Sequence, residues 1–323
     1  MTELSVIICT HNPRPDYLDR VLAALRRQTL PTDHWELLLI DNASEPALAG
    51  KWDLSWHPHA RHIREDELGL APARLRGIAE AKGVVLVFVD DDNVLAPNFL
   101  DAAIRLGGEW PQLGVWGGCI IPEFEIEPPD NLRRYLRAIA MVEVESPQWS
   151  NVATCSAAEV CGAGMCLRAD LAAAYSKFYK SSKIRLTGRL GQHLTSGEDS
   201  EICRLICSLG RGMGIFPDLR LTHLIPRRRL TEQYLIQLSE GIQTSSHLLN
   251  FKWQGTVPKQ PFLGVELLRF IKHVTLRRGV DRRMFMARCR AALRARAIIG
   301  ATQGAEQTAQ PWGNVNAHSV DQA

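Results

Sequence analysis

An unbroken apolar run that ends in three carboxylates constrains the fold of this chain more than any other feature. Residues 84–89 read Val-Val-Leu-Val-Phe-Val, and Asp90, Asp91 and Asp92 follow directly. A short run of β-branched and aromatic residues predicts a strand buried on both faces, as in the centre of a parallel sheet. Such sheets bind ligands at the carboxyl ends of their strands, and carboxylate oxygens suit Mg²⁺ or Mn²⁺ better than zinc. The sequence therefore predicts a divalent-metal site at this edge.

Short apolar segments alternate with helical patterns in the N-terminal part. Residues 5–9 and 36–40 are apolar strands, and residues 61–65 form a shorter third one. Two sets of apolar side chains at helical spacing lie between the strands, and Gly83 ends the second helix: Leu18, Val21, Leu22 and Leu25, then Leu75, Ile78 and Ala79. This alternation predicts a doubly wound α/β fold with parallel strands.

Polar residues follow the last apolar residue of three predicted strands. They are Thr10, Asp41 and Asp90 to Asp92, and parallel strands bring their carboxyl ends to the edge where α/β proteins bind nucleotides. The chain contains neither Gly-x-Gly-x-x-Gly nor Gly-x-x-x-x-Gly-Lys-Ser/Thr. A bound pyrophosphate would therefore be neutralised by a metal and by Arg or Lys side chains. The plainer alternative is that these aspartates are turn residues.

A second acidic pair, Glu198 and Asp199, precedes another helical pattern. The apolar side chains that follow at i, i+3, i+4 and i+7 are Ile202, Leu205, Ile206 and Leu209, which predict one buried helix face. Adjacent helical residues point about 100° apart, so the two carboxylates cannot face one hydroxyl. Ser196 and Asp199 also have capping-box spacing, so helix capping is the alternative to a catalytic role.

Composition limits the class of protein. Hydrophobic residues make up 46% of the chain, and no apolar run approaches the roughly 20 residues that cross a bilayer. The N-terminus lacks a secretory-signal pattern and the eight cysteines include no Cys-x-x-Cys pair, so we expect a cytoplasmic protein with reduced thiols. The chain lacks the aromatic-interleaved basic surface of nucleic-acid binders.

Basic charge is concentrated in the C-terminal part. Residues 261–323 contain ten Lys or Arg and four Asp or Glu, in a chain whose net charge is +3. Arginines from Arg269 to Arg296 alternate with apolar residues. Two interpretations stay open: a solvated amphipathic helix pair that closes the domain, and peripheral contact of residues 261–296 with anionic lipid at the inner face of a membrane. Periodicity ends beyond Arg296, which predicts a disordered tail.

Five sequence segments occur together in a fixed order. They are Ser-Val-Ile-Ile-Cys-Thr-His-Asn at 5–12, Leu-Leu-Leu-Ile-Asp-Asn at 37–42, Gly-Leu-Ala-Pro-Ala-Arg-Leu-Arg-Gly at 69–77, Phe-Val-Asp-Asp-Asp at 88–92 and Gly-Glu-Asp at 197–199. In this order they resemble glycosyltransferase family 2, the inverting enzymes with the GT-A fold, and its non-processive bacterial-type members. His11 and Leu75 depart from the residues that many members have, Tyr and Asn.

The resemblance implies a fold and a division of the chain. The fold would be a Rossmann-like mixed sheet flanked by helices, with a C-terminal helical extension. Residues 1–230 would form the GT-A domain, residues 231–300 the basic extension and residues 301–323 the disordered tail.

The same resemblance assigns roles to single residues. Donor-binding roles fall to Thr10, Asn12, Asp41, Arg74, Asp90 and Asp91. Metal-binding roles, for Mn²⁺ or Mg²⁺, fall to Asp90, Asp92 and His223, although a histidine in an apolar setting is more often simply packed. Asp199 is implied as the catalytic base, with Glu198 beside it.

Two further segments are interpreted from composition. Small residues at 161–165, Cys-Gly-Ala-Gly-Met, would let substrate approach the backbone and form part of the donor or acceptor wall. Residues 175–197 hold five cations among Gly and Ser and suggest a mobile loop; the cations are Lys177, Lys180, Lys183, Arg185 and Arg189.

The activity implied is metal-dependent, inverting transfer of a single sugar in polysaccharide or glycoconjugate biosynthesis, of the hexosyltransferase type. The donor would be a nucleoside-diphosphate sugar, with a UDP-sugar favoured, and the acceptor a glycan or a lipid-linked sugar. Single addition is expected because the Gln-x-x-Arg-Trp signature of processive synthases is absent. Two alternatives remain: a sugar-1-phosphate nucleotidyltransferase, which normally carries a glycine-rich N-terminal phosphate loop, and a non-catalytic protein that binds nucleotide sugars.

Overall fold

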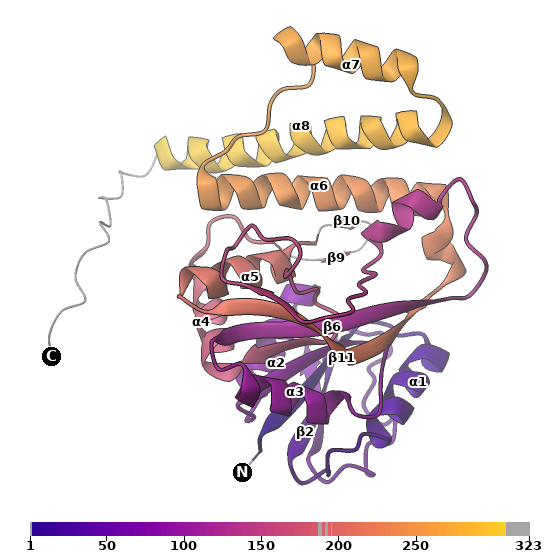
Figure 1. The fold of residues 1–323 in the computed structure, drawn as a ribbon, viewed down its shortest axis with the longest axis vertical. Helices are drawn as coiled ribbons and strands as arrows, with labels where there is room; N and C mark the ends of the chain where they lie inside the picture. Colours follow the sequence, from indigo (N-terminus) through magenta and orange to yellow (C-terminus); the bar gives the residue numbers. More distant parts are fainter. Residues whose placement is uncertain (1, 187–188, 191–192, 195, 308–323) are drawn as a thin grey trace, which may run out of the picture.

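A mixed β-sheet forms the centre of the molecule (Figure 1). The computed structural model describes residues 2–186, 189–190, 193–194 and 196–307. Within these residues the sheet has nine strands, in the order β3-β2-β1-β4-β8-β6-β11-β5, and β7 pairs with β11 beside this path. A separate two-stranded ribbon is made of β9 (Arg189–Leu190) and β10 (His193–Leu194).

The half of the sheet predicted from the sequence is parallel. Its strands are β1 (Leu4–Thr10), β2 (Trp35–Asn42), β3 (Ala60–Glu65) and β4 (Val85–Asp90). The two helices predicted between them are α1 (Pro15–Arg26) and α2 (Leu70–Glu80). The apolar run enters the sheet one residue later than expected, because Val84 is 61% exposed and lies outside β4.

The other half of the sheet mixes both strand directions, which confirms the predicted mixed fold. Its strands are β5 (Asn93–Leu95), β6 (Leu113–Phe124), β7 (Gln148–Ser150), β8 (Met165–Arg168) and β11 (Gly212–Ile225). β8 runs antiparallel to both β4 and β6, whereas β6 and β11 are parallel. β5 returns antiparallel to β11 directly after the acidic cluster. The turn from β4 to β5 therefore carries the three aspartates to the end of β11.

The sheet is buried on both faces because successive strand residues point to opposite sides. Val6 and Ile8 of β1 pack in the cluster that includes α1 and α3 (Phe99–Glu109). Ile7 belongs to the cluster on the other face, which includes α2, α4 (Ala169–Ser181) and α5 (Glu198–Ser208). This two-sided burial explains why the central strands are continuous apolar runs.

Three helices follow the sheet, as predicted for a helical extension. They are α6 (Glu232–Gln254), α7 (Gly264–Leu276) and α8 (Gly279–Gln307), and two short 3₁₀ helices, η1 (Arg133–Ala138) and η2 (Arg227–Leu230), lie beside them. α6 and α8 lie side by side above the sheet, and α7 lies beyond α8 (Figure 1). Leu136, Ile225, Leu235 and Met284 share one apolar cluster, so α6 and α8 are packed onto the first part of the chain.

Two predictions of irregular segments were wrong for the residues that the structure describes. Residues 175–181, predicted as the start of a mobile loop, form the second half of α4; Tyr175 and Tyr179 are buried there, so packing holds the helix. The tail predicted beyond Arg296 is helical as far as Gln307, because α8 continues. Residues 308–323 and parts of 187–195 lie outside the described residues.

β6 and β11 approach each other closely at Gly118. A Cβ atom at this position would lie 1.9 Å from the backbone oxygen of Leu219. The pairing register of the two strands shifts between Phe216 and Arg220, opposite this glycine. The missing side chain therefore permits the irregularity after which β11 continues to His223.

We expect Gly118→Ala to destabilise the fold by about 1–3 kcal/mol, because the added methyl group overlaps a backbone atom. The matched control is Gly108→Ala in α3, where nothing lies within 4 Å of the added Cβ atom. This control should raise stability by about 0.5–1 kcal/mol, the helix preference of Ala over Gly. Thermal and urea unfolding measure both; equal stability of the two variants would contradict the close approach.

Candidate functional site

A cleft of about 550 Å³ opens at the carboxyl ends of β1 and β4. This is the edge of the sheet at which the sequence predicts a ligand. All but one of the predicted site residues line the cleft: Thr10, Asn12, Arg74, Asp90, Asp91, Asp92, Glu198, Asp199 and His223. Cys161, Gly162 and Ala163 of the predicted substrate wall also line it. Residues separated by more than 200 positions thus meet in one cavity.

The three aspartates occupy different environments. Asp90 is partly exposed at the cleft, with 35% of its side chain accessible. Asp91 accepts a hydrogen bond from the Thr10 hydroxyl, and burial together with the charges of Asp92 and Asp90 raises the pKa of Asp91 to about 7. Asp92 is buried and accepts a hydrogen bond of 2.9 Å from the side-chain amide of Asn93. The protein therefore eases the repulsion expected of three adjacent acids by raising the pKa of Asp91, which lies beside a hydroxyl, and by placing Asp92 beside positive charge.

Arg229 of η2 brings positive charge to Asp92, and His223 at the end of β11 lies beside the same carboxylate. The Nη1 atom of Arg229 lies 3.0 Å from Asp92 Oδ2, and His223 Nε2 lies 3.6 Å from the same oxygen. Arg229 Nη1 also lies 3.0 Å from His223 Nε2, and His223 Nδ1 lies 3.5 Å from the Ala140 carbonyl. If His223 Nδ1 donates its hydrogen to this carbonyl, the Nε2 atom keeps its lone pair, which accepts from the Arg229 guanidinium.

This arrangement fits a divalent cation only in part. Asp92 and His223 supply one oxygen and one nitrogen at a place that already holds a positive group. No group of three His, Cys, Asp or Glu side chains suited to a metal occurs among the residues that the structure describes. Magnesium-type sites commonly use one or two carboxylates and complete their coordination with water and substrate phosphates. The residues therefore fit a metal that shares its coordination with a phosphate ligand.

Arg74 lies buried between two carboxylates. Its Nη1 atom is 3.2 Å from Glu198 Oε1, and its Nη2 atom is 3.7 Å from Asp90 Oδ1. Burial opposes the charge of this guanidinium, but Glu198 and Asp90 outweigh that effect and raise the pKa of Arg74 above its usual value. Gly162 makes room for it, because a Cβ atom there would lie 2.5 Å from Nη2. Arg74 is a fixed cation that connects the two acidic groups of the cleft.

Glu198 and Asp199 point in different directions at the start of α5, as the helical geometry predicts. Glu198 pairs with Arg74. Asp199 Oδ2 accepts a hydrogen bond from the Gly162 amide at 3.2 Å, and Oδ1 accepts one from the Ser200 amide at 2.9 Å. Two backbone amides thus hold the Asp199 carboxylate at the cleft.

The alternative that Asp199 belongs to a capping box is not supported. The residue that caps α5 is Gly197, in the left-handed conformation, and no side chain caps this helix end. The amide of Ser196 instead donates to the Ser245 hydroxyl of α6 at 3.3 Å. Contact with α6, rather than a local capping motif, positions the start of α5.

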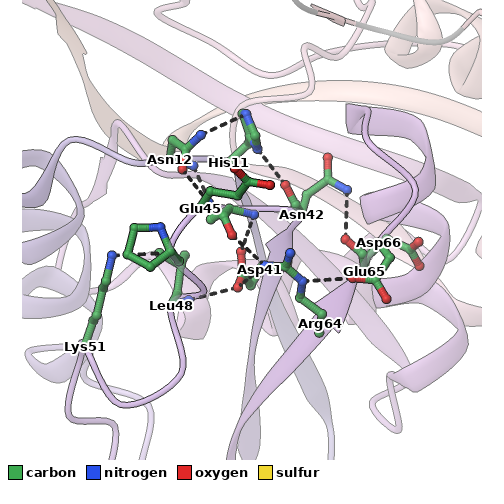
Figure 2. A network of polar contacts seen from close by, with 12 residues as sticks. His11, Asn12, Asp41, Asn42, Glu45, Leu48, Lys51, Arg64, Glu65 and Asp66 are labelled. Carbon is green, nitrogen blue, oxygen red and sulfur yellow. Dashed lines mark hydrogen bonds and ion pairs between the residues drawn. The ribbon is translucent and has the colours of Figure 1, made fainter.

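Asp41 is the predicted site residue that does not line the cleft. Its Oδ1 atom accepts from the Ser44 amide, and its Oδ2 atom accepts from the Leu48 amide and from Arg64 (Figure 2). Asn12 reaches the same loop, because its Oδ1 accepts from the Glu45 amide. In the structure Asp41 stabilises the loop after β2, and its predicted contact with a nucleotide would need these hydrogen bonds to change.

Sequence reasoning missed several residues that line the cleft. They are Arg14, Tyr17, Arg228 and Arg229. Arg229 is the most important of them, because it contacts two of the three predicted metal ligands, Asp92 and His223. A signal was present in the run Arg227-Arg228-Arg229, which follows His223 closely, and in the expectation that arginines replace a glycine-rich phosphate loop.

Comparisons with known proteins relate this chain to glycosyltransferases. Residues 5–140 match the family model described as Glycosyl transferase family 2. A Bacillus subtilis (strain 168) protein named as the glycosyltransferase EpsH is 25% identical over 109 residues, which are 33% of this chain and 30% of that protein. Glycosyltransferase AglE of Haloferax volcanii is 29% identical over 92 residues, which are 28% of this chain and 30% of that protein. The match thus spans less than a third of the length of each relative.

A solved structure supports the fold over most of the chain. It is the mannosyltransferase PcManGT from Pyrobaculum calidifontis in complex with GDP-Man and Mn²⁺, with a TM-score of 0.53 and 18% identity. The likeness covers 96% of this chain and 76% of that one. The fold is therefore GT-A, and residues 5–140 are similar to glycosyltransferase family 2.

Proposed function

We propose that the protein transfers a single sugar from a nucleoside-diphosphate sugar to a hydroxyl group, with inversion and with a divalent metal. The observation that carries this proposal is that the Asp92–His223 pair and the amide-held Asp199 line one cleft. The first provides a place for a metal and a diphosphate. The second provides a base, which a protein that only binds nucleotide sugars would not need.

Asp199 would accept the proton of the acceptor hydroxyl. The hydroxyl oxygen then bonds to the anomeric carbon from the face opposite the diphosphate, and the bond from that carbon to the diphosphate oxygen breaks. Each Asp199 oxygen accepts a hydrogen bond from one backbone amide. These two bonds orient the carboxylate and leave lone pairs free to receive the proton of the acceptor sugar's hydroxyl group. Glu198 would act as a positioning residue, because its carboxylate pairs with Arg74.

The negative charge of the departing diphosphate needs neutralisation. A bound Mn²⁺ or Mg²⁺, held by Asp92 and His223 with Asp90 nearby, would supply Lewis-acid stabilisation of the leaving group. Arg229 and Arg228 also line the cleft and would add positive charge from the protein. This agrees with the mannosyltransferase neighbour, whose complex contains GDP-Man and Mn²⁺.

The proposal leaves two things open: the nucleotide base of the donor, and the identity of the acceptor. Thr10 and Asn12 line the cleft beside the aspartates and would face the nucleoside. A UDP-sugar is the donor that the sequence favours, and a glycan or a lipid-linked sugar is the acceptor. Nucleotide release from UDP-, GDP- and dTDP-sugars with Mn²⁺ tests the activity itself. Release of pyrophosphate from a nucleoside triphosphate and a sugar phosphate would instead identify a nucleotidyltransferase.

We expect Asp199→Asn to keep donor affinity and to lower the transfer rate about 10²- to 10⁴-fold, the usual contribution of a general base. Calorimetry with the donor and rate measurements with saturating acceptor separate the two effects. Glu198→Gln is the matched control at the neighbouring position, and it should weaken donor binding through Arg74. A normal transfer rate in Asp199→Asn would refute the role of this residue as base.

We expect Asp92→Asn to weaken Mn²⁺ binding at least about tenfold, because one neutral amide oxygen replaces a charged ligand. Electron paramagnetic resonance of free Mn²⁺, in the presence of the nucleoside diphosphate, measures this without turnover. Asp101→Asn, an exposed substitution on α3, controls for the loss of one negative charge. Unchanged Mn²⁺ affinity in Asp92→Asn would show that the metal site lies elsewhere.

Arg229 competes with a metal for Asp92 in the described arrangement. We therefore expect Arg229→Gln to bind Mn²⁺ alone more tightly, by about tenfold or 1.4 kcal/mol, and to bind the nucleoside diphosphate more weakly. Arg228→Gln removes the same charge from an exposed position in the same cleft and should leave the affinity for Mn²⁺ alone nearly unchanged. Equal Mn²⁺ affinities of the two variants would exclude competition.

A further inference from the structure

Helix α7 has no part in the proposed activity. None of its residues is buried. It lies on the side of α8 that faces away from the sheet, at one end of the molecule (Figure 1). A helix of about 20 Å in this position gains little from the core, so its sequence needs another explanation.

One face of α7 packs on α8 through aromatic side chains. Phe270 lies between Phe262, at a ring distance of 4.7 Å, and Phe285 of α8, at 6.0 Å. His273 also contacts Phe285, at 5.0 Å. These contacts fix which side of α7 faces outward.

The outward side of α7 is apolar. Large side chains there are exposed by 50–69% of their surface, namely Val265, Leu268, Ile271 and Leu276. Leu263, directly before the helix, is 62% exposed. An apolar surface of this extent on one helix is a mark of an interaction site, and we call these five residues the outer face of α7.

The charges on and around the outer face are positive. Arg269 and Lys272 are exposed on α7, and Arg278 is exposed just after it. The acidic residue of α7 is Glu266, whose side chain is 26% exposed and is paired with Arg269 at 2.8 Å. Apolar side chains interspersed with cations that can extend to phosphate groups are typical of a helix that lies in a lipid interface.

Two arginines of α8 have a different role. Arg283 pairs with Glu232 of α6, and Arg290 pairs with Glu240 of α6 at 2.8 Å. They connect two helices within the protein. The two interpretations of the basic C-terminal segment, domain closure and contact with lipid, therefore apply to different helices. α8 closes the domain, whereas the outer face of α7 stays exposed to solvent.

We propose that the outer face of α7 docks on a membrane surface that contains anionic lipid. The helix would lie parallel to the surface, with Leu268 and Ile271 among the acyl chains and Lys272 at the phosphates. None of the described helices is long and apolar enough to pass through a bilayer, so contact from one side is the form that the described structure allows. Taken with the proposed transfer function, this location favours a lipid-linked acceptor.

Vesicle co-sedimentation of the full chain, without donor or acceptor, tests the docking independently of catalysis. Wild type should bind vesicles of phosphatidylcholine with about 30% phosphatidylglycerol, bind phosphatidylcholine alone much more weakly, and be released by salt. Leu268→Glu should lower binding to the anionic vesicles at least about tenfold, and Lys272→Glu at least about fivefold. Both positions are exposed, so unfolding is not expected, and circular dichroism checks this.

The matched control is Val84→Glu, a similar substitution at an exposed apolar residue outside the C-terminal helices. It should bind the vesicles as wild type does. Absence of binding by wild type, or equal binding by Leu268→Glu, would overturn the proposal. So would a dimer in light scattering that Leu268→Glu dissociates and that anionic vesicles do not, because the outer face would then be an interface between two copies.

Discussion

Asp92 is a buried carboxylate, and the geometry of the cleft depends on how its charge is compensated. A buried charge without a partner is very costly, and Asp92 obtains its partner from Arg229, almost 140 positions later in the sequence. The backbone oxygen of Asp92 also accepts from the Leu224 amide at 2.8 Å. The turn after β4 is therefore joined to the end of β11 through the backbone and to η2 through the Asp92 side chain.

The same principle explains the other side of the cleft. Arg74 joins α2 to the acidic cluster through Asp90 and to α5 through Glu198. Its position requires that Gly162 lack a side chain, and the Gly162 amide holds Asp199. A substitution at Gly162 would thus disturb a cation and a candidate base together. This double contact explains why Gly162 lacks a side chain, a reason that differs from the close approach of substrate predicted for residues 161–165.

The sequence predicts those parts of the molecule that depend on local pattern. The central strands could be found because burial on both faces demands continuous apolar runs, and the position of Asp90 to Asp92 follows from the end of such a run. The contact of Asp92 with Arg229 could not be found, because it depends on the path of β11 and on the irregularity beside Gly118. Asp41 shows the opposite case: it does lie at the carboxyl end of a strand, β2. Its oxygens, however, accept hydrogen bonds from the Ser44 and Leu48 amides and from Arg64, and sequence spacing cannot reveal such competition.

Without a ligand, the charges of the cleft are balanced among themselves. Arg229 faces Asp92, and Arg74 faces Glu198 and Asp90. A diphosphate entering alone would meet the exposed Asp90 carboxylate, and a divalent cation entering alone would have to displace Arg229. If the proposed metal and nucleoside diphosphate bound together, Asp92 would hold the cation in place of Arg229, and the Arg229 guanidinium would be free to pair with the phosphates. On the proposed function, the electrostatics of the cleft would therefore favour joint binding of metal and nucleotide over binding of either one by itself.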